Sequence, residues 1–194
     1  MRKQSSFRSY QAVDLFLWAV ILAVFELLVF TAGTRWFPGQ PYIVSLTPVI
    51  TAIVLVRWGA WAALHAVLGG LVLCFASHAD PTRFAVYCIG NSFALLVLPF
   101  LRRWRKEEGL WRDSMKVLTF GLCVLLLTQA GRALVSLVLG AELSLVPGFF
   151  TTEVITDLFT LVVLWIVRRL DGVLEDQRHY LLRLREEEKK SRQF

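Results

Sequence analysis

Hydrophobic residues are gathered in six long runs, which are separated by short polar stretches. The runs are roughly Val13–Gly33, Tyr42–Trp58, Gly59–Ser77, Phe84–Leu101, Val117–Leu139 and Val146–Val167. Each is close to the about 17–25 residues that a helix needs to cross the hydrocarbon core of a membrane. The pattern predicts an all-α, polytopic membrane protein with six transmembrane helices.

The second run is the weakest of the six. Its polar or helix-breaking residues are Ser45, Thr47, Pro48 and Thr51. The turn that follows it, in the sequence RWGAW, is very short. Arg57 and Gly59 favour a cytoplasmic hairpin at this turn over one long broken helix.

Composition agrees with a membrane protein. The chain is 56% hydrophobic and only 19% charged, whereas about a quarter of the residues of an average soluble domain are charged. Most of the charges lie in LRRWRKEEGLWRDSMK and in the last part of the chain. The basic N-terminus precedes an apolar run that is too long for a signal peptide and contains Glu26, so we expect the first helix to be retained.

The positions of the basic residues predict the orientation. If the N-terminus is cytoplasmic, all but three of the 21 Lys and Arg residues lie in inner loops or in the C-terminal tail. The exceptions are Arg35 and Arg83 in outer loops and Arg132 within a run. By the positive-inside rule this bias places both termini in the cytoplasm.

Residues 1–170 are therefore expected to form one six-helix transmembrane domain, and residues 171–194 a charged cytoplasmic tail. Leucine and valine recur between the charges of the tail, which indicates a helix continuing the sixth transmembrane helix. Such a helix lies on the membrane, contacts a partner or is solvated, and the sequence leaves these three possibilities open.

Polar residues within the runs are candidate site residues, because ionisable groups in the hydrocarbon region are costly and usually face the bundle interior. A rise of 1.5 Å per residue places Arg132, Glu26 and Glu153 roughly 9–11 Å below the outer surface. The same count brings further polar residues to about this depth or somewhat deeper. They are Asn91, Thr47, Thr51, Gln129 and Asp157. We call these eight residues the polar layer, in the outer half of the membrane.

The charges of this layer are unbalanced, because one arginine cannot neutralise Glu26, Glu153 and Asp157 together. Two interpretations remain. Arg132 pairs with Glu153 or Asp157 and only holds the helices together, or the layer lines a water-filled, outward-facing pocket for a ligand. The excess of acids favours a ligand with cationic or donor-rich character.

Other chemistry has little support. No nucleophile with its base, nucleotide-binding loop or zinc signature is present, so we expect neither an enzyme nor a cofactor. Cys74, Cys88 and Cys123 lack metal-binding or disulfide spacing, and we expect small buried residues. His65 is expected to form an internal hydrogen bond. No basic surface interleaved with aromatic residues indicates nucleic-acid binding.

The chain resembles the S components, the substrate-binding subunits, of energy-coupling factor (ECF) vitamin transporters. The best match is YIVSLTPVITAIVLVRWGAWAALHAVLGGLVLCF, Tyr42 to Phe75, which is similar to the second and third helices of that family. The resemblance implies six helices, cytoplasmic termini and capture of a vitamin or similar small molecule from the outer side. Transport would be powered by separate cytoplasmic ATPase subunits. The N-terminal histidine arrangement of the cobalt and nickel members is absent, so a metal substrate is not expected.

The resemblance also implies a partner surface. Family members present alanines, spaced AxxxA on the first helix, to a membrane-embedded T component, and Ala19 and Ala23 have this spacing. Glu26 falls near the same face of the helix, because it follows Ala23 by three residues. One helix face cannot serve both the partner and the pocket, so these two assignments compete.

Two further functions stay open. The long charged tail is typical of a membrane scaffold or sensor module that recruits a cytoplasmic partner, in which case the polar layer is structural. A stand-alone secondary transporter requires inverted repeats or broken helices, and neither is clear in the sequence.

Overall fold

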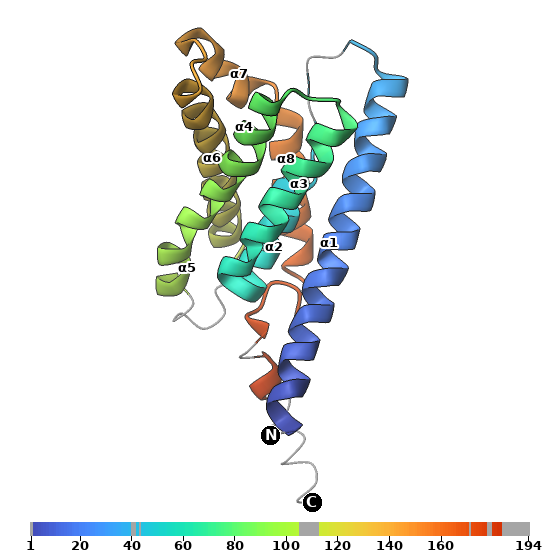
Figure 1. The fold of residues 1–194 in the computed structure, drawn as a ribbon. Helices are drawn as coiled ribbons and strands as arrows, with labels where there is room; N and C mark the ends of the chain where they lie inside the picture. Colours follow the sequence, from blue (N-terminus) through green and yellow to red (C-terminus); the bar gives the residue numbers. More distant parts are fainter. Residues whose placement is uncertain are drawn as a thin grey trace, which may run out of the picture.

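The computed structural model describes residues 2–39, 42, 44–104, 113–170, 172–177 and 180–183. These residues form helices and turns without any strand, which confirms the all-α prediction. The α-helices are α1 (Arg2–Trp36), α2 (Thr47–Trp58), α3 (Ala62–Ala76), α4 (Pro81–Asn91), α5 (Leu98–Trp104), α6 (Ser114–Val138), α7 (Val146–Thr151) and α8 (Val154–Val167) (Figure 1). Short 3-10 helices follow α2, α4 and α6 at Gly59–Trp61, Ser92–Val97 and Leu143–Leu145.

Four helical stretches in the described part of the chain are long and apolar enough to cross a membrane. They are Phe7–Trp36, Thr47–Ala76, Pro81–Leu101 and Ser114–Val138. The pair Leu143–Thr151 and Val154–Val167, bent by 40°, makes a fifth if it is counted as one span. These helices fit a membrane protein, while the six spans and the orientation of the termini stay predictions.

The stretch Thr47–Ala76 is a hairpin. Gly59 turns the chain with a φ of 62°, in the region that favours glycine. Beyond the turn, a β-carbon added to Gly69 would lie 2.0 Å from the Thr47 hydroxyl oxygen. The start of α2 and the middle of α3 therefore touch, which is impossible in one straight helix. The hairpin predicted at RWGAW is confirmed.

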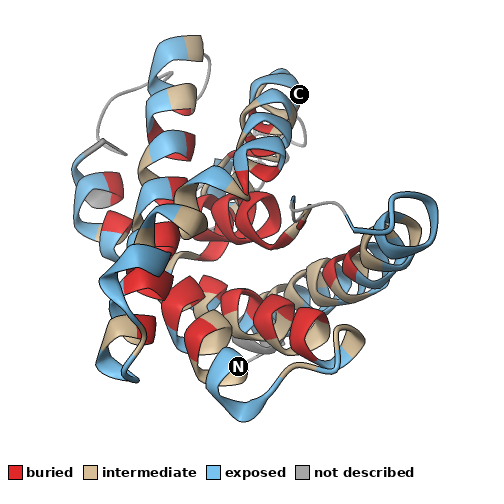
Figure 2. Cartoon of the chain, turned by 90° about the horizontal axis from the view of Figure 1, so that it is seen from above, coloured by how far each residue is buried: buried red, intermediate tan, exposed pale blue. Residues whose placement is uncertain are grey.

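Helix α2 forms the centre of the bundle. Every residue from Thr47 to Trp58 is buried, and the helix contacts α1, α3, α6 and α8. A helix that is apolar on nearly every side requires such surroundings. Helix α1 instead exposes large apolar residues such as Phe16, Val20 and Phe25. Seen from above, buried residues gather where the helices face one another (Figure 2).

Two of the predicted spans are broken. The sixth run is divided at Thr152 and Glu153, between α7 and α8. The fourth changes from α-helix to 3-10 helix after Asn91 and back to α-helix at Leu98. Neither break is predicted by hydropathy, because the few polar residues at each break are flanked on both sides by apolar sequence. Such interruptions of an α-helix are common near functional residues, and each of these adjoins a member of the polar layer.

The tail does not continue the last helix directly, so that part of the prediction is wrong, although Gln177 and residues 180–183 are again helical. Helix α8 ends at Val167, and the chain turns at Gly172, which has a φ of 76°. Arg57 at the end of α2 holds this turn, because its Nη1 donates to the carbonyl oxygens of Gly172 (2.6 Å) and Val173 (3.2 Å). Residues 184–194 lie outside the described residues.

The tail segment also contacts the start of α1. The hydroxyl group of Tyr10 donates to Oε1 of Gln177 over 3.0 Å, and Arg57 forms an ion pair with Asp14 over 2.7 Å. The beginning of α1 and residues 172–177 therefore lie at the same end of the bundle (Figure 1). We call this end the terminal end, and the other one the loop end.

Candidate functional site

Arg132 on α6 is the centre of a buried polar network. Its side chain is fully buried. Its Nε donates to Oδ1 of Asn91 over 2.6 Å, and its Nη1 forms an ion pair with Oε1 of Glu153. Its guanidinium group also lies over the ring of Tyr87, 4.7 Å from the ring centroid. The predicted grouping of Arg132, Asn91 and Glu153 is therefore present, with Tyr87 as a member that the sequence did not indicate.

Two glycines allow this network to form. A β-carbon on Gly90 would lie 2.7 Å from the backbone nitrogen of Arg132, and one on Gly131 would lie 2.5 Å from the carbonyl oxygen of Gly90. Real β-carbons essentially never approach other atoms so closely, so α4 and α6 can cross at this distance only through glycine. The close crossing brings Arg132 beside Asn91.

Asn91 extends the network to α3. Its Nδ2 donates to the carbonyl oxygen of Ala66 over 3.0 Å. Gly70, one turn further along α3, lies so close to α4 that a β-carbon would approach the backbone of Tyr87 within 2.9 Å. The small residues of α3 thus serve close packing and fix the α4 backbone that carries Tyr87 and Asn91.

Glu26 belongs to the same layer but has a different partner. Its side chain is buried, and its Oε2 accepts a hydrogen bond of 2.7 Å from the backbone N–H of Leu46, just before α2. The N-terminus of a helix favours such a negative charge. Next to Leu46, the N–H of Ser45 donates to Oγ1 of Thr156 over 3.0 Å. Glu26 therefore anchors the connection between α1 and α2.

The structure bears on whether the same face of α1 carries both Glu26 and the predicted partner surface. Glu26 faces the bundle interior, whereas Ala19 and Ala23 are half-buried at the flank of α1. Contact of these alanines with a T component stays a prediction.

Gln129 and Asp157 form a separate pair within the layer. The amide nitrogen of Gln129 donates to both carboxylate oxygens of Asp157, over 2.9 and 2.8 Å. Each of the three acids thus has its own partner: Arg132 for Glu153, a backbone N–H for Glu26 and an amide for Asp157. Each acid therefore has a hydrogen-bond partner, but only Glu153 is paired with a cation.

Several buried polar atoms of the layer nevertheless have no hydrogen-bond partner among the described residues. They are Nη2 of Arg132, Oε1 of Glu26 and the hydroxyl oxygens of Thr47 and Thr51. Buried polar groups in native proteins are nearly always paired with protein or water. The layer therefore keeps both a donor and acceptors unused.

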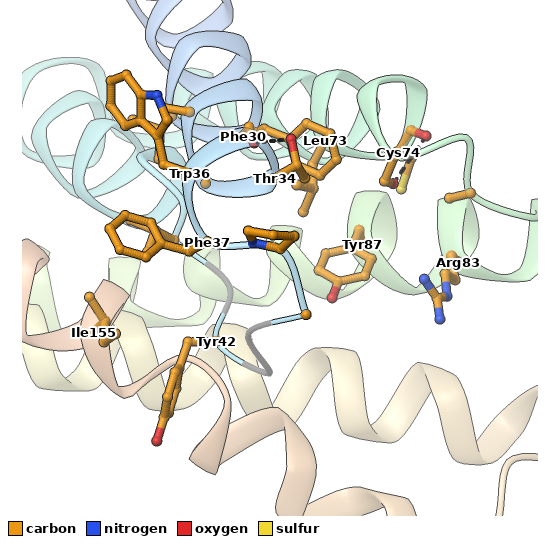
Figure 3. A pocket seen from close by; sticks show the side chains of 18 residues that line it. Phe30, Thr34, Trp36, Phe37, Tyr42, Leu73, Cys74, Arg83, Tyr87 and Ile155 are labelled. Atoms are coloured by element: carbon orange, nitrogen blue, oxygen red, sulfur yellow. Dashed lines mark hydrogen bonds between the residues drawn. The ribbon is translucent and has the colours of Figure 1, made fainter.

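A cavity of about 1030 Å³ opens at the loop end, above the polar layer. Its walls come from the end of α1, the α1–α2 connection, the end of α3, the start of α4 and the start of α8. Five aromatic side chains line it. They are Phe30, Trp36, Phe37, Tyr42 and Tyr87 (Figure 3). None of the eight predicted site residues is among the lining residues.

The polar layer lies one helical turn beneath this cavity. On α1, Phe30 lines the cavity and Glu26 lies four residues deeper; on α4, Tyr87 lines it and Asn91 lies four residues deeper. Four residues correspond to about 6 Å along a helix. Tyr87 belongs to both levels, because its ring contacts Arg132 and lines the cavity.

The rim of the cavity carries a charge. Arg83 is the only charged residue among the described residues that line it. Asp80, three residues earlier, caps α4 by accepting the backbone N–H of Arg83, and this hydrogen bond lowers the pKa of the Asp80 carboxyl group. The sequence assigns Arg83 only to an outer loop, and it offers no signal that the residue lines a cavity.

His65 has the structural role that the sequence suggests, and the three cysteines are unpaired. His65 is buried, and its Nε2 lies 3.0 Å from the carbonyl oxygen of Leu15, which confirms the predicted internal hydrogen bond. Cys74, Cys88 and Cys123 are free thiols. In the described part of the chain, no three His, Cys, Asp or Glu residues gather where a metal could bind.

Comparisons with known proteins found no relative of this chain. No protein family model, no curated protein and no solved structure matches this chain.

Proposed function

We propose that this protein is a membrane-embedded substrate-binding protein, which captures a small molecule in the cavity at the loop end. One observation carries the proposal: an aromatic-lined cavity lies directly above a buried polar network that retains unpaired groups. Small-molecule sites are typically concave and largely apolar, with a few polar groups that fix the ligand, and they measure about 300–1,000 Å³.

The resemblance to ECF S components extends this proposal. In that role the chain crosses a bacterial plasma membrane six times with both termini in the cytoplasm, and the cavity opens outward. A T component and cytoplasmic ATPase subunits supply the energy for transport, and α1 with Ala19 and Ala23 contacts the T component. The support comes from the similarity of Tyr42–Phe75 and from the basic residues of the predicted inner loops.

The proposal is tested by native mass spectrometry of the full-length protein, freshly purified in lipid nanodiscs. We expect a bound small molecule, and its addition raises the melting temperature by mass action. Phe30→Ala removes a lining ring and lowers the bound fraction, whereas Phe25→Ala, on the exposed side of α1, leaves it unchanged. Absence of any bound molecule, or equal effects of the two variants, contradicts the proposal.

The alternative is a scaffold or sensor module, and one observation favours it. Arg57 and Tyr10 hold residues 172–177 at a fixed place on the terminal end, as recruitment of a partner by the tail would require. Removal of residues 184–194 distinguishes the two functions. Under the main proposal, ligand retention is unchanged by this truncation. A scaffold instead loses its cytoplasmic partner and shows no ligand to begin with.

A further inference from the structure

The cavity has a distinct electrostatic character. Its described lining is aromatic and apolar except for Arg83 and a few small polar groups, and the sequence from Pro38 to Val44 contains no charged residue. The acids that favour a cationic ligand in the sequence lie one turn deeper, each with its own partner. A molecule in the cavity therefore meets a cation and aromatic rings, and no acid among the described lining residues.

Arg83 is available to a ligand. Its side chain is 67% exposed, and its ion pair with Asp80 is long, at 3.7 Å. Exposed ion pairs contribute little to stability. Asp80 is moreover occupied by capping α4 through the backbone N–H of Arg83. The guanidinium group can thus turn to an anion in the cavity at small cost.

The spacing of Arg83 and Tyr87 indicates the shape of a ligand that contacts both residues. The two residues are four positions apart on α4, which places them on one face of the helix, about 6 Å apart along its axis. Both line the cavity (Figure 3). A guanidinium group binds a planar carboxylate through two parallel hydrogen bonds, and the Tyr87 ring offers a surface for another ring.

Arg132 adds little net charge to the cavity, because it is buried beneath it and forms an ion pair with Glu153. Its guanidinium group instead supports the ring of Tyr87 from below. Among the described lining residues, Arg83 is therefore the cation that a ligand meets.

We propose that the cavity binds a flat aromatic molecule with a carboxylate group, the ring packed between Phe30 and Tyr87 and the carboxylate at Arg83. This inference rests on the proposed function, because it requires that the cavity be the ligand site. It names the class of substrate that the lining selects.

Three probes with one ring system and different charges test it: 1-naphthaleneacetate, 1-naphthaleneacetamide and 1-naphthylethylamine. Their affinities are measured by thermal shift on the full-length protein in nanodiscs, with empty nanodiscs as a control for partition into lipid. We expect the carboxylate to bind at least about tenfold more tightly than the amide, as for one charge-assisted hydrogen-bonded pair. The amine binds most weakly.

Two variants test whether Arg83 causes the preference for the carboxylate over the amide. Arg83→Gln reduces the affinity for naphthaleneacetate to that of the amide and leaves the amide unchanged. Arg35→Gln is the matched control, because Arg35 is an exposed cation at the same end that does not line the cavity. It changes neither affinity.

The inference is overturned if the amide or the amine binds as tightly as the carboxylate, if Arg83→Gln has no effect, or if none of the probes binds. These results do not decide the proposed function, which is tested separately by native mass spectrometry. A neutral or cationic molecule that copurifies and depends on Phe30 refutes the substrate class alone, whereas absence of any copurified molecule refutes the proposed function.

Discussion

Arg132 lies in the middle of an apolar helix, and the contacts of its side chain come from α4 and from the residue that precedes α8. Counting depth along the predicted helices is enough to group Arg132 with Asn91 and Glu153, because helices of similar length bring equal depths together. The partner of Glu26 is not predictable in this way. It is a backbone N–H at the start of α2, and side-chain chemistry in the sequence carries no signal for it.

A double-mutant cycle measures the pair of Arg132 and Glu153. Arg132→Met alone leaves a buried carboxylate without its cation, and we expect a loss of about 3–5 kcal/mol in the free energy of unfolding. Arg132→Met combined with Glu153→Gln leaves no buried charge and costs less than the single change. The measurement is reversible unfolding in detergent micelles. A double variant that loses the sum of the two single effects contradicts the contact.

At the scale of helices, glycine decides how closely neighbours pack. Hydropathy predicts the positions of the apolar helices and the hairpin at Gly59, because apolar runs and turn residues carry these signals. It does not predict the breaks at Thr152–Glu153 and after Asn91. Both lie at short groups of polar residues within otherwise apolar runs, so the hydropathy of the whole run does not reveal them.

Gly131 and Gly33 offer a matched comparison. A β-carbon on Gly131 would collide with Gly90 and Phe93, whereas nothing lies within 4 Å of one on Gly33. We expect Gly131→Ala to destabilise the protein by about 1–3 kcal/mol or more, as overpacking does. Gly33→Ala stabilises it by a few tenths of a kcal/mol, because alanine favours a helix. Thermal unfolding in one detergent compares the two, and equal melting temperatures contradict the close crossing of α4 and α6.

Arg57 is expected to hold the tail segment in place. Arg57→Gln removes charged donors to the carbonyl groups of Gly172 and Val173. We therefore expect hydrogen exchange of the amides in residues 173–177 to rise at least about tenfold. Arg169→Gln is the control, since Arg169 is exposed and its guanidinium group lies over the ring of Trp165. If exchange is unchanged in the Arg57 variant, the contact does not fix the segment.

For the whole molecule, the sequence predicts the fold class and the membrane character better than it predicts the site. The cavity arises where the α1–α2 connection and the ends of four helices meet, so its lining is scattered over distant parts of the chain. Trp36, at the end of α1, has no feature in the sequence that marks it as a lining residue, and only the three-dimensional arrangement gives it a place in the cavity wall.

Topology is testable in bacterial cells with alkaline phosphatase, which is active only outside the cytoplasm. We expect high activity when the enzyme is fused after Gly140, in the predicted outer loop between α6 and α7, and low activity when it is fused to the C-terminus. A fusion after Trp104, at the end of α5, is also expected to be inactive. High activity at the C-terminus contradicts the predicted orientation and, with an inactive fusion after Gly140, reverses it.

The most direct test of the account is a structure of the full-length protein, purified with its bound molecule in lipid nanodiscs. The account predicts density for a compact molecule between Phe30 and Tyr87, close to Arg83, and loss of that density in Phe30→Ala. An empty cavity, or a lipid acyl chain running through it into the bilayer, contradicts the claim that this cavity is a substrate site.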